Sequence, residues 1–433
     1  FFDLNRRERY TLEQEKHINE TALCKIIGLT LETRPDCITP VEIQRFLEYG
    51  VTRVQIGIQH TDDKLLKKIN RGCRHKDAQK AIHMLKDSGF KVLGHLMPNL
   101  PGATPEGDME MFNQMIDDPL NQIDEWKIYP TSVTTTSDKD ETEVYTQIEK
   151  WYREGSYTPY SNDALLMVVS HAMRNVGQSV RIARIFRDIP VANITAGADI
   201  PHMRQVCEEL LKENGEYCAC IRSREIKNMD FHNDELIYDV HEYEGSHNTD
   251  YFITATLYNE KSHPMGNIVG FLRLRLKTCK LSAIEVVPEI KGCALVRELH
   301  VYGRMRPTYI NQLEDPEETQ SSQHRGIGRN LLGIAENIAE QNGFSEMAII
   351  SGVGVRNYYK KLGYKLDKAF MKKKLNYDWM VLGLYTMYFI IICYNMVSLL
   401  YWGKKAPILE LERNTSDYLS AMIGATNKTR DIY

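Results

Sequence analysis

Apolar and polar positions alternate along the first half of the chain in a repeating order of strand and helix. Apolar runs predict strands at 26–32, 51–59, 90–98 and 125–131. Between them, apolar residues recur at helical spacing in 40–50, 63–72, 75–89 and 104–118. Each unit takes roughly 30 residues, which is typical of a parallel sheet or barrel. Because a complete eight-stranded barrel needs about 250 residues, we expect a partial (β/α) barrel.

The pattern changes after this repeat. A polar segment at 131–143 predicts a surface loop, and residues 145–212 are predicted to be mainly helical. Near residue 235 a new series begins, with strands expected at 235–243, 251–258, 268–276 and 294–302. A helix at 327–342, a strand at 346–352 and a helix at 355–362 follow. The fold class is therefore α/β, with a barrel part at 1–205, a linker at 206–234 and a second α/β domain at 235–375.

Composition adds a few limits to this picture. The chain has 433 residues and a formal net charge of -4, which fits a mildly acidic globular protein and gives no overall sign of nucleic-acid binding. The 9 cysteines are scattered and suggest a reducing compartment, the cytoplasm. The first residues resemble neither a signal peptide nor a protein start, so we interpret them as the middle of a longer protein.

One segment near the end departs from that composition. Residues 379–402 contain no charged side chain, carry aromatic residues at both edges and are flanked by lysines. Such a segment can cross the ~30 Å hydrocarbon core of a bilayer. We therefore expect a membrane helix at 376–403 that anchors the protein, followed by a polar tail at 404–433. A buried core helix, or a segment without function, is the alternative.

A glycine-containing turn precedes the helix expected at 327–342. Residues 323–328 read Q-x-x-G-x-G, with Gln323, Arg325, Gly326 and Gly328 at the marked positions. Glycine lets backbone N–H groups approach a phosphate closely, and the positive end of the helix points at the same place. We expect a pyrophosphate here, although a glycine pattern of this length is also common at ordinary helix starts.

The order of motifs around this turn resembles that of GNAT acetyltransferases. A strand ("ALVRELHVYG", 294–303) precedes the turn, and "VRNYYKKLGYK" (355–365) follows the next strand. The resemblance implies acetyl-CoA as cofactor, bound by the backbone of a strand that splays from its neighbour. The implied acetyl-CoA contacts are Glu298, Leu299, His300, Val301, Gln323, Arg325, Gly326, Ile327, Gly328, Arg329 and Tyr359.

The resemblance also implies catalytic roles for three side chains. Glu298 would be a general base, and Tyr359, with Tyr358 beside it in the site, would protonate or position the leaving thiolate. The alternative for Glu298 is a surface carboxylate at a strand edge. For the tyrosines the alternative is aromatic packing, which we expect of one of the two.

Polar or sulfur-containing side chains also recur at the carboxyl ends of successive barrel strands, where a parallel barrel carries its active site. These positions include Glu32, Gln59 and Met97. Together with "RIFRDIP" (184–190), "CIRSREI" (220–226) and "ISGVGVRNYYKKLGY" (350–364), the motifs resemble the catalytic subunit of Elongator. That family joins a radical-SAM barrel to a GNAT domain and forms carboxymethyluridine at the wobble position of tRNA from acetyl-CoA. The resemblance implies S-adenosylmethionine and a [4Fe-4S] cluster as cofactors, with Glu32, Gln59 and Met97 as candidate SAM contacts.

Two features depart from that family. Its three closely spaced cluster cysteines are not in this sequence, and Cys24, Cys37 and Cys73 are too far apart to replace them. The glycine motif for the SAM amino group is missing too, so we expect this chain not to cleave SAM on its own. In many relatives a third cysteine stands where this chain has Ser223, and the group holds zinc. Cys218 and Cys220 are therefore candidate zinc ligands, or two linker cysteines.

The resemblance further implies tRNA as partner, bound by its anticodon stem-loop, and other Elongator-type subunits or a homodimer. The densest basic set in the sequence contains Arg181, Arg184, Arg187, Arg222, Arg224 and Lys227. A solvated charged face is the alternative. For the whole chain, we predict a tRNA uridine(34) acetyltransferase. The rival hypotheses are a protein lysine or histone acetyltransferase and a tRNA-binding pseudoenzyme.

Overall fold

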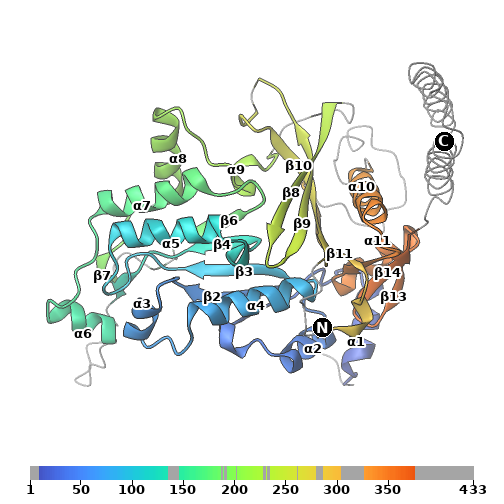
Figure 1. Ribbon diagram of the computed structural model, residues 1–433, viewed down its shortest axis with the longest axis horizontal. Coiled ribbons are helices and arrows are strands. Elements are labelled where there is room, and N and C mark those ends of the chain that lie inside the picture. Colours follow the sequence, from blue (N-terminus) through green and yellow to red (C-terminus); the bar gives the residue numbers. More distant parts are fainter. Residues whose placement is uncertain are drawn as a thin grey trace, which may run out of the picture. The chain divides into compact units, whose positions relative to one another are not determined.

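The computed structural model describes residues 9–134, 146–186, 189, 193–200, 202–227, 231, 235–260, 262–278, 286–303 and 326–375. Residues 1–375 form one compact unit, drawn in Figure 1. The membrane helix expected at 376–403 and the polar tail at 404–433 lie outside the described residues. Within the described ranges, no helix has the length and apolarity that a membrane span requires.

A parallel sheet occupies the first half of this unit. Its strand order is β1-β2-β3-β4-β6, with β1 (Thr30–Thr33), β2 (Arg53–Gln59), β3 (Lys91–Leu96), β4 (Glu125–Ile128) and β6 (Arg181–Ile185). The helices of this half are α2 (Pro40–Tyr49), α3 (Asp63–Lys68), α4 (His75–Asp87), α5 (Pro105–Asp117), α6 (Gln147–Arg153), α7 (Asn162–Asn175) and α8 (Met203–Glu213). This arrangement confirms the predicted βα repeat.

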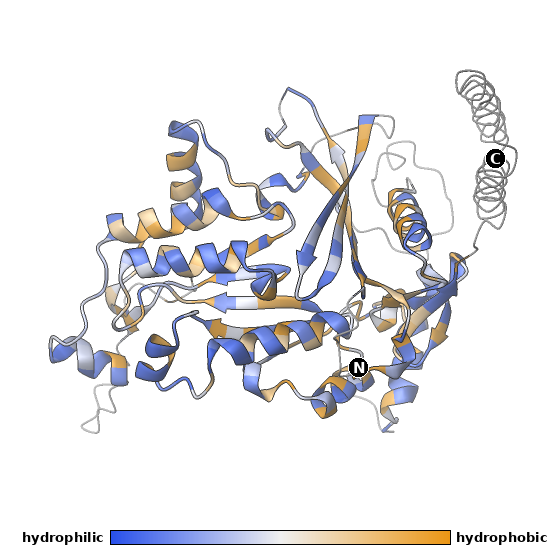
Figure 2. Ribbon diagram, viewed as in Figure 1, coloured by the Kyte–Doolittle hydropathy of each residue, from blue (hydrophilic) through white to orange (hydrophobic). Residues whose placement is uncertain are grey.

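Local sequence explains where these helices begin. Thr39 and Thr104 each cap a helix with their hydroxyl, and a proline follows at the first helical position. A hydroxyl at the cap satisfies a free backbone N–H, and proline fits the first turn, where its missing N–H is not needed. In Figure 2 the long helices carry both colours along their length, as expected for helices with one buried face.

Three short strands of this first half were not predicted. β6 and β7 (Ile194–Gly197) lie inside the region predicted to be mainly helical, and β5 (Ser132–Thr134) lies at the start of the predicted loop. The loop prediction is wrong at 132–134, because β5 pairs with β7 in a small antiparallel sheet. Residues 135–145 lie outside the described ranges. Strands of three to five residues are too short for periodicity to distinguish them from neighbouring helices.

A mixed sheet forms the second half, in the order β13-β14-β12-β11-β10-β9-β8. Its strands are β8 (Leu236–Gly245), β9 (Asn248–Leu257), β10 (Asn267–Leu276), β11 (Ala294–Val301), β12 (Glu346–Ile350), β13 (Lys365–Asp367) and β14 (Phe370–Lys374). The remaining helices are α1 (Leu12–Thr21), α9 (Ile221–Arg224), α10 (Ile327–Gln341) and α11 (Arg356–Lys361). β11 and β12 pair in parallel, whereas β10–β11 and β12–β14 are antiparallel.

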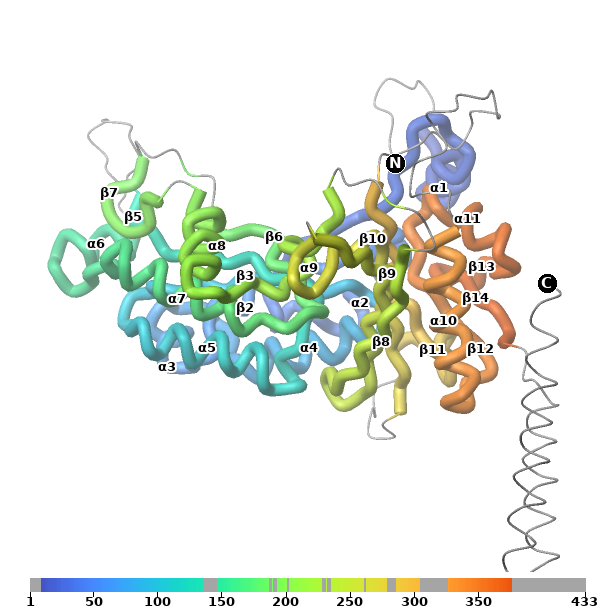
Figure 3. Tube along the Cα trace, turned by 90° about the horizontal axis from the view of Figure 1, so that it is seen from above, coloured from blue at the N-terminus to red at the C-terminus, as the bar shows by residue number. Residues whose placement is uncertain are grey.

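The two faces of the second sheet have different neighbours (Figure 3). On one face, Val296 and Leu274 pack in a core with Ile327 and Leu331 of α10. On the other face, Leu295 joins a core that includes Val92 and Phe90 of the first half. The second sheet is therefore enclosed between α10 and the first half, and side chains on its inner face meet the beginnings of β3 and β4.

Candidate functional site

β11 separates from its parallel neighbour after a short contact. Only Ala294, Leu295 and Val296 pair with β12, whereas pairing with β10 continues to Val301. In the described part of the chain, residues 297–301 thus have a strand partner on one edge only. On the edge that faces β12, the backbone N–H and C=O groups of these residues have no partner strand among the described residues. They can therefore form hydrogen bonds with a ligand. The sequence analysis expected this separation for an acetyl-CoA site.

A β-bulge at Arg297 changes which side chains face the first half. The pairing of β11 with β10 shifts register between Arg273 and Leu274, so one extra residue stands on β11. Before the bulge, Leu295 packs toward the first half; after it, Leu299 and Val301 pack toward α10. Consecutive residues of a regular strand point to opposite faces. The bulge therefore allows both Arg297 and Glu298 to reach the first half.

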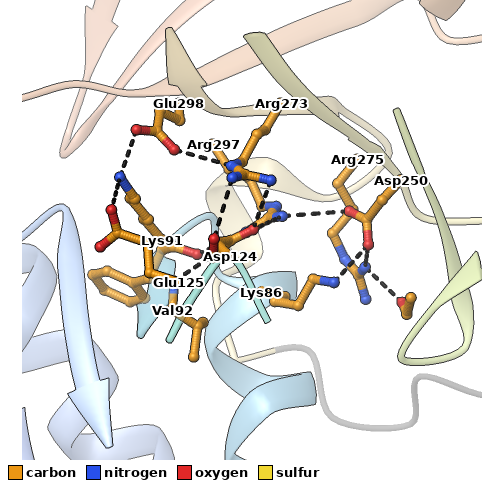
Figure 4. Close-up of polar contacts among 12 residues, drawn as sticks. Lys86, Lys91, Val92, Asp124, Glu125, Asp250, Arg273, Arg275, Arg297 and Glu298 are labelled. Carbon is orange, nitrogen blue, oxygen red and sulfur yellow. Dashed lines mark hydrogen bonds and ion pairs between the residues drawn. The ribbon is translucent and has the colours of Figure 1, made fainter. Parts of the chain in front are cut away.

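Glu298 forms one ion pair with Lys91 of the first half and another with Arg273 of β10 (Figure 4). Its carboxylate lies 2.6 Å from Lys91 Nζ and 3.0 Å from Arg273 Nε. Burial by itself raises the pKa of Glu298, but the charges of Lys91 and Arg273 outweigh it and leave the pKa below its ordinary value. A carboxylate held by two cations is a weak base, so the structure does not favour the expected general-base role. Nor is Glu298 the surface carboxylate of the alternative interpretation.

Arg297 makes a fully buried contact between the two halves. Its guanidinium donates two hydrogen bonds to the Asp124 carboxylate, at 2.7 and 2.8 Å, and one to Phe90 O at 3.1 Å. Asp124 also accepts from Val92 N at 2.8 Å. Burial raises the pKa of Asp124, but Arg297 and Arg273 outweigh it, and the pKa lies well below its usual range. The first half is thus joined to β11 by a buried, bidentate charge pair.

A second charged group lies beside this pair. Asp250 accepts from Arg275 at 2.8 Å and lies 2.7 Å from Lys86 Nζ, at the end of α4. Burial lowers the pKa of Lys86 to about 8, although Asp250 opposes the shift. The sequence analysis did not identify either group. The only available signal was the presence of arginines in an otherwise apolar strand, "FLRLRL" at 271–276.

We expect these carboxylates to make stability depend on acidic pH. The pKa values of Asp124, Asp250 and Glu298 lie below their ordinary values of 3.8, 3.8 and 4.5. The unfolded chain therefore binds more protons at low pH, and the free energy of unfolding falls as the pH drops through 4.5 and below. Urea midpoints between pH 7 and about pH 3 measure this decrease, and Asp124→Asn should flatten it. A parallel decrease in both proteins would assign the effect to other groups.

The start of α10 lies beside the open edge of β11. Gly326 is the cap residue, with a φ of 79° that favours glycine. At Gly328 a Cβ atom would lie 2.6 Å from Tyr358 Oη and 3.7 Å from Val301 Cγ2. Gly328 thus leaves room for the Tyr358 hydroxyl against the first turn of α10, where Arg329 is exposed. Gln323 and Arg325 lie outside the described residues.

The two adjacent tyrosines of α11 differ in their surroundings. Tyr358 is 41% exposed and its hydroxyl lies against the first turn of α10, whereas Tyr359 is 6% exposed and contacts the Tyr364 ring inside the core. Burial raises the pKa of Tyr358 despite the opposing charge of Arg329, so its hydroxyl keeps its proton at neutral pH. The structure therefore places Tyr358, not Tyr359, where a ligand of the glycine turn would lie. One tyrosine of the pair packs in the core, as the sequence analysis expected.

His300 lies on the inner face of β11, beyond Glu298. It is exposed, stacks on Phe271 at 5.7 Å between ring centroids and meets the Tyr302 ring edge-on at 4.5 Å. Tyr302 Oη donates to Glu225 at 3.1 Å. The inner side of the open strand therefore presents aromatic rings.

The three candidate SAM contacts lie at one edge of the first sheet. Glu32, Gln59 and Met97 are at the carboxyl ends of β1, β2 and β3, which are neighbours in the sheet. Met97 N donates to Gln59 O at 2.7 Å, and Gln59 has a φ of 71°, uncommon for a residue with a side chain. The Glu32 carboxylate lies 3.6 Å from His95 Nδ1. The fold brings these positions together as the sequence predicted.

The cysteines do not form a metal site in the described part of the chain. No three His, Cys, Asp or Glu side chains converge there on a common point that could hold a metal ion. Cys24, Cys37 and Cys73 are among the described residues and do not converge in this way, so these thiols do not fit a [4Fe-4S] cluster. Cys218 and Cys220 are buried, and Arg204 Nη2 donates to Cys220 Sγ at 3.2 Å and to Ser223 Oγ at 2.9 Å. The positively charged Arg204 guanidinium thus occupies the position beside Cys220 Sγ that a zinc ion would need. These residues therefore do not fit zinc.

The basic residues predicted to bind RNA divide into buried and exposed groups. Arg224 is 2% exposed and donates to Ala219 O and Gln178 O, so the prediction that it contacts phosphate is wrong. Arg181 pairs with Glu225 at 2.8 Å. Arg184, Arg222 and Lys227 are exposed, and Arg187 lies outside the described residues. A buried arginine that satisfies backbone carbonyls cannot be recognised from local sequence.

Comparison with known proteins identifies the family. Residues 3–115 match the model of the radical SAM superfamily, and residues 123–213 match that of the Radical_SAM C-terminal domain. The tRNA uridine(34) acetyltransferase of Dehalococcoides mccartyi is 37% identical over 370 residues, which cover 84% of this chain and 76% of the relative. Elongator complex protein 3 of Bos taurus is 34% identical over 362 residues, covering 82% of this chain and 62% of the relative.

A solved structure agrees with these matches. The archaeal Methanocaldococcus infernus Elp3 with an N-terminal deletion superposes with a TM-score of 0.72 at 33% identity, covering 85% of this chain and 83% of that one. The resemblance found in the sequence is therefore confirmed over both halves. With a radical SAM domain in its first half and these relatives along most of its length, the chain belongs to the family of tRNA uridine(34) acetyltransferases that includes Elongator complex protein 3.

Proposed function

We propose that this protein uses acetyl-CoA to modify the wobble uridine of tRNA. The relatives that establish the family bear that activity in their names. The single observation that carries the proposal is the open edge of β11, which lies beside the amino end of α10, where the Tyr358 hydroxyl approaches Gly328. Open strand amides and a helix amino end suit a thioester carbonyl and a diphosphate, respectively.

Each part of the site has a distinct role in this proposal. The backbone of Glu298–Val301 binds the pantetheine arm and polarises the thioester carbonyl. The amino end of α10, from Gly326 to Arg329, binds the diphosphate together with Gln323 and Arg325. The Tyr358 hydroxyl, protonated at neutral pH, donates a proton to the departing thiolate. Tyr359 contributes to the core that supports this helix.

Other parts of the proposal rest on the family. Glu32, Gln59 and Met97 would contact S-adenosylmethionine, which supplies radical chemistry in radical SAM domains. The described cysteines do not fit a cluster, and the proposed reaction at acetyl-CoA includes no step that depends on one. Arg184, Arg222 and Lys227, with Arg181 and Arg187, would contact tRNA phosphates, and other Elongator-type subunits or a second copy would complete the assembly. We propose a barrel part, a linker to 234 and a GNAT-type domain to 375; the barrel part ends after α8 at 213, because the expected boundary at 205 lies inside that helix.

Arg329→Glu tests the diphosphate site without disturbing the fold. Glutamate is favourable in the first turn of a helix, so the melting temperature should be unchanged or slightly higher. The same glutamate repels a diphosphate, and we expect the Kd for acetyl-CoA to rise at least about tenfold. Lys365→Glu, an equal charge change at an exposed position of β13, is the matched control. Equal affinity of Arg329→Glu and the control would refute the site.

The acceptor is tested with labelled acetyl-CoA in the same proteins. The purified protein is offered tRNA and, separately, a lysine peptide, and acetyl-CoA turnover and label transfer are measured. We expect tRNA to stimulate turnover in the parent and in Lys365→Glu but not in Arg329→Glu. Label on the peptide alone would favour a protein acetyltransferase. An absence of saturable acetyl-CoA binding would favour a pseudoenzyme.

A further inference from the structure

We infer that residues 19–28, docked on the turn before α11, hold Tyr358 in place at the acetyl-CoA site, with Glu20 as the positioning residue. The inference rests on the proposed function and adds a residue from the first half of the chain to the site in the second half. We call residues 19–28 the docking segment. It comprises the last three residues of α1 and the stretch that leads towards β1, which carries Glu32.

The docking segment has a defined backbone conformation. The Asn19 side chain donates to Ile26 O at 2.9 Å and accepts from Ile26 N at 2.8 Å, closing the segment into a loop. Gly354 N donates to Ile26 O at 3.1 Å. At Gly352 a Cβ atom would lie 1.8 Å from Ile27 O, so the two backbones touch. The segment is therefore packed against the turn 352–355 rather than lying loosely over it.

Glu20 fixes the helix that follows this turn. Its carboxylate accepts from Arg356 Nη1 at 3.0 Å and from Lys360 Nζ at 2.8 Å, and its backbone oxygen accepts from Asn357 Nδ2 at 3.1 Å. Glu20 and Arg356 are both buried. Residues 356 and 360 are one helical turn apart and lie on one face of α11. The Glu20 carboxylate therefore binds α11 along that face.

The contacts of Glu20 with α11 determine the direction in which the Tyr358 side chain points. α11 has only 6 residues, too few to be stable without tertiary contacts. Glu20 holds one face, and Tyr359 holds the helix from the core. With both contacts present, the rotation of α11 is fixed, and the intervening Tyr358 is directed at the start of α10. Without the Glu20 carboxylate, Arg356 loses its buried partner, and α11 can turn or shift.

The test is a double-mutant cycle in the full chain. Glu20→Gln removes the charge but keeps the shape, and Tyr358→Phe removes the hydroxyl that it is inferred to position. We expect Glu20→Gln to raise the Kd for acetyl-CoA at least about fivefold, and to change it less than about twofold when Tyr358→Phe is already present. Glu13→Gln, on the same helix with a side chain that is 76% exposed, is the control and should leave the Kd unchanged.

A second variant covers the case in which Glu20→Gln does not fold. Lys360→Met removes the half-exposed partner and leaves the buried Glu20–Arg356 pair intact, so a smaller increase in the same direction is expected. Parent-like affinity of both variants would overturn the inference but not the proposed function. An equal loss with and without Tyr358→Phe would also overturn it, because the effect would then not pass through the tyrosine. If the parent itself does not bind acetyl-CoA, both the proposed function and the inference fail.

Discussion

Asp124→Ala is expected to lower the free energy of unfolding by about 3–5 kcal/mol, the usual cost of removing one partner of a buried ion pair. The variant leaves Arg297 without its bidentate acceptor in a region closed to water, and it leaves Arg273 with Glu298 as its remaining partner. It also removes the acceptor of Val92 N at the start of β3. Urea denaturation of the full chain measures the change.

The matched control is an aspartate whose pair is open to solvent. Asp36 pairs with Arg34 at 2.6 Å, and both side chains are partly exposed. Exposed pairs contribute at most about 1 kcal/mol, so Asp36→Ala should have a small effect. If Asp124→Ala and Asp36→Ala lower the free energy of unfolding by the same small amount, the Arg297–Asp124 contact does not join the two halves in solution. Replacing Asp124 and Arg297 together by Leu and Met should recover part of the loss, because no unpaired charge then remains.

Gly352→Ala is expected to detach the docking segment and to weaken acetyl-CoA binding severely. A methyl group at this position would lie 1.8 Å from Ile27 O and 2.7 Å from Ile27 C, and both atoms belong to the backbone. No side chain can move aside, so the segment itself has to shift. We expect a stability loss at the upper end of the usual 1–3 kcal/mol for overpacking, together with faster proteolysis within residues 19–28.

Gly333→Ala provides a control with the opposite expected sign. This glycine lies within α10, and a Cβ atom there would meet nothing within 4 Å. Alanine inside a helix is more favourable than glycine by roughly 0.5–1 kcal/mol, so the control should stabilise the protein and keep acetyl-CoA affinity. Parent-like proteolysis of Gly352→Ala would contradict the docked arrangement. If residues 19–28 are cleaved faster but the Kd for acetyl-CoA is unchanged, docking of the segment is not required for ligand binding.

The positions of the main helices and strands could be predicted because their signals are local. Thr39 and Thr104 with the prolines that follow them mark helix starts, and the apolar run before Gln59 marks a strand. The order of motifs around Gly326 and Gly328 also placed the chain in its family, which the comparisons confirm. These signals depend on a few residues that are neighbours in the sequence, so they can be recognised without the structure.

Local patterns failed where the partner is distant in sequence or where two neighbours are chemically alike. Arg224 looked like a phosphate ligand, yet it donates to the backbone at Gln178. Tyr358 and Tyr359 are identical side chains, and only the rotation of α11 sends one to the ligand site and the other into the core. That rotation depends on Glu20, more than 300 positions away.

The sequence by itself determined the family, the alternation of strands and helices, and the location of the glycine turn at the start of α10. Only the tertiary structure decided that Glu298 pairs with Lys91 and Arg273, and that Asp124 and Arg297 join the two halves. The physical reason is that a charged side chain is neutralised by whatever folding brings within a few ångströms of it. The bulge on β11, which turns both Arg297 and Glu298 toward the first half, leaves no signal in the local pattern of apolar and polar residues.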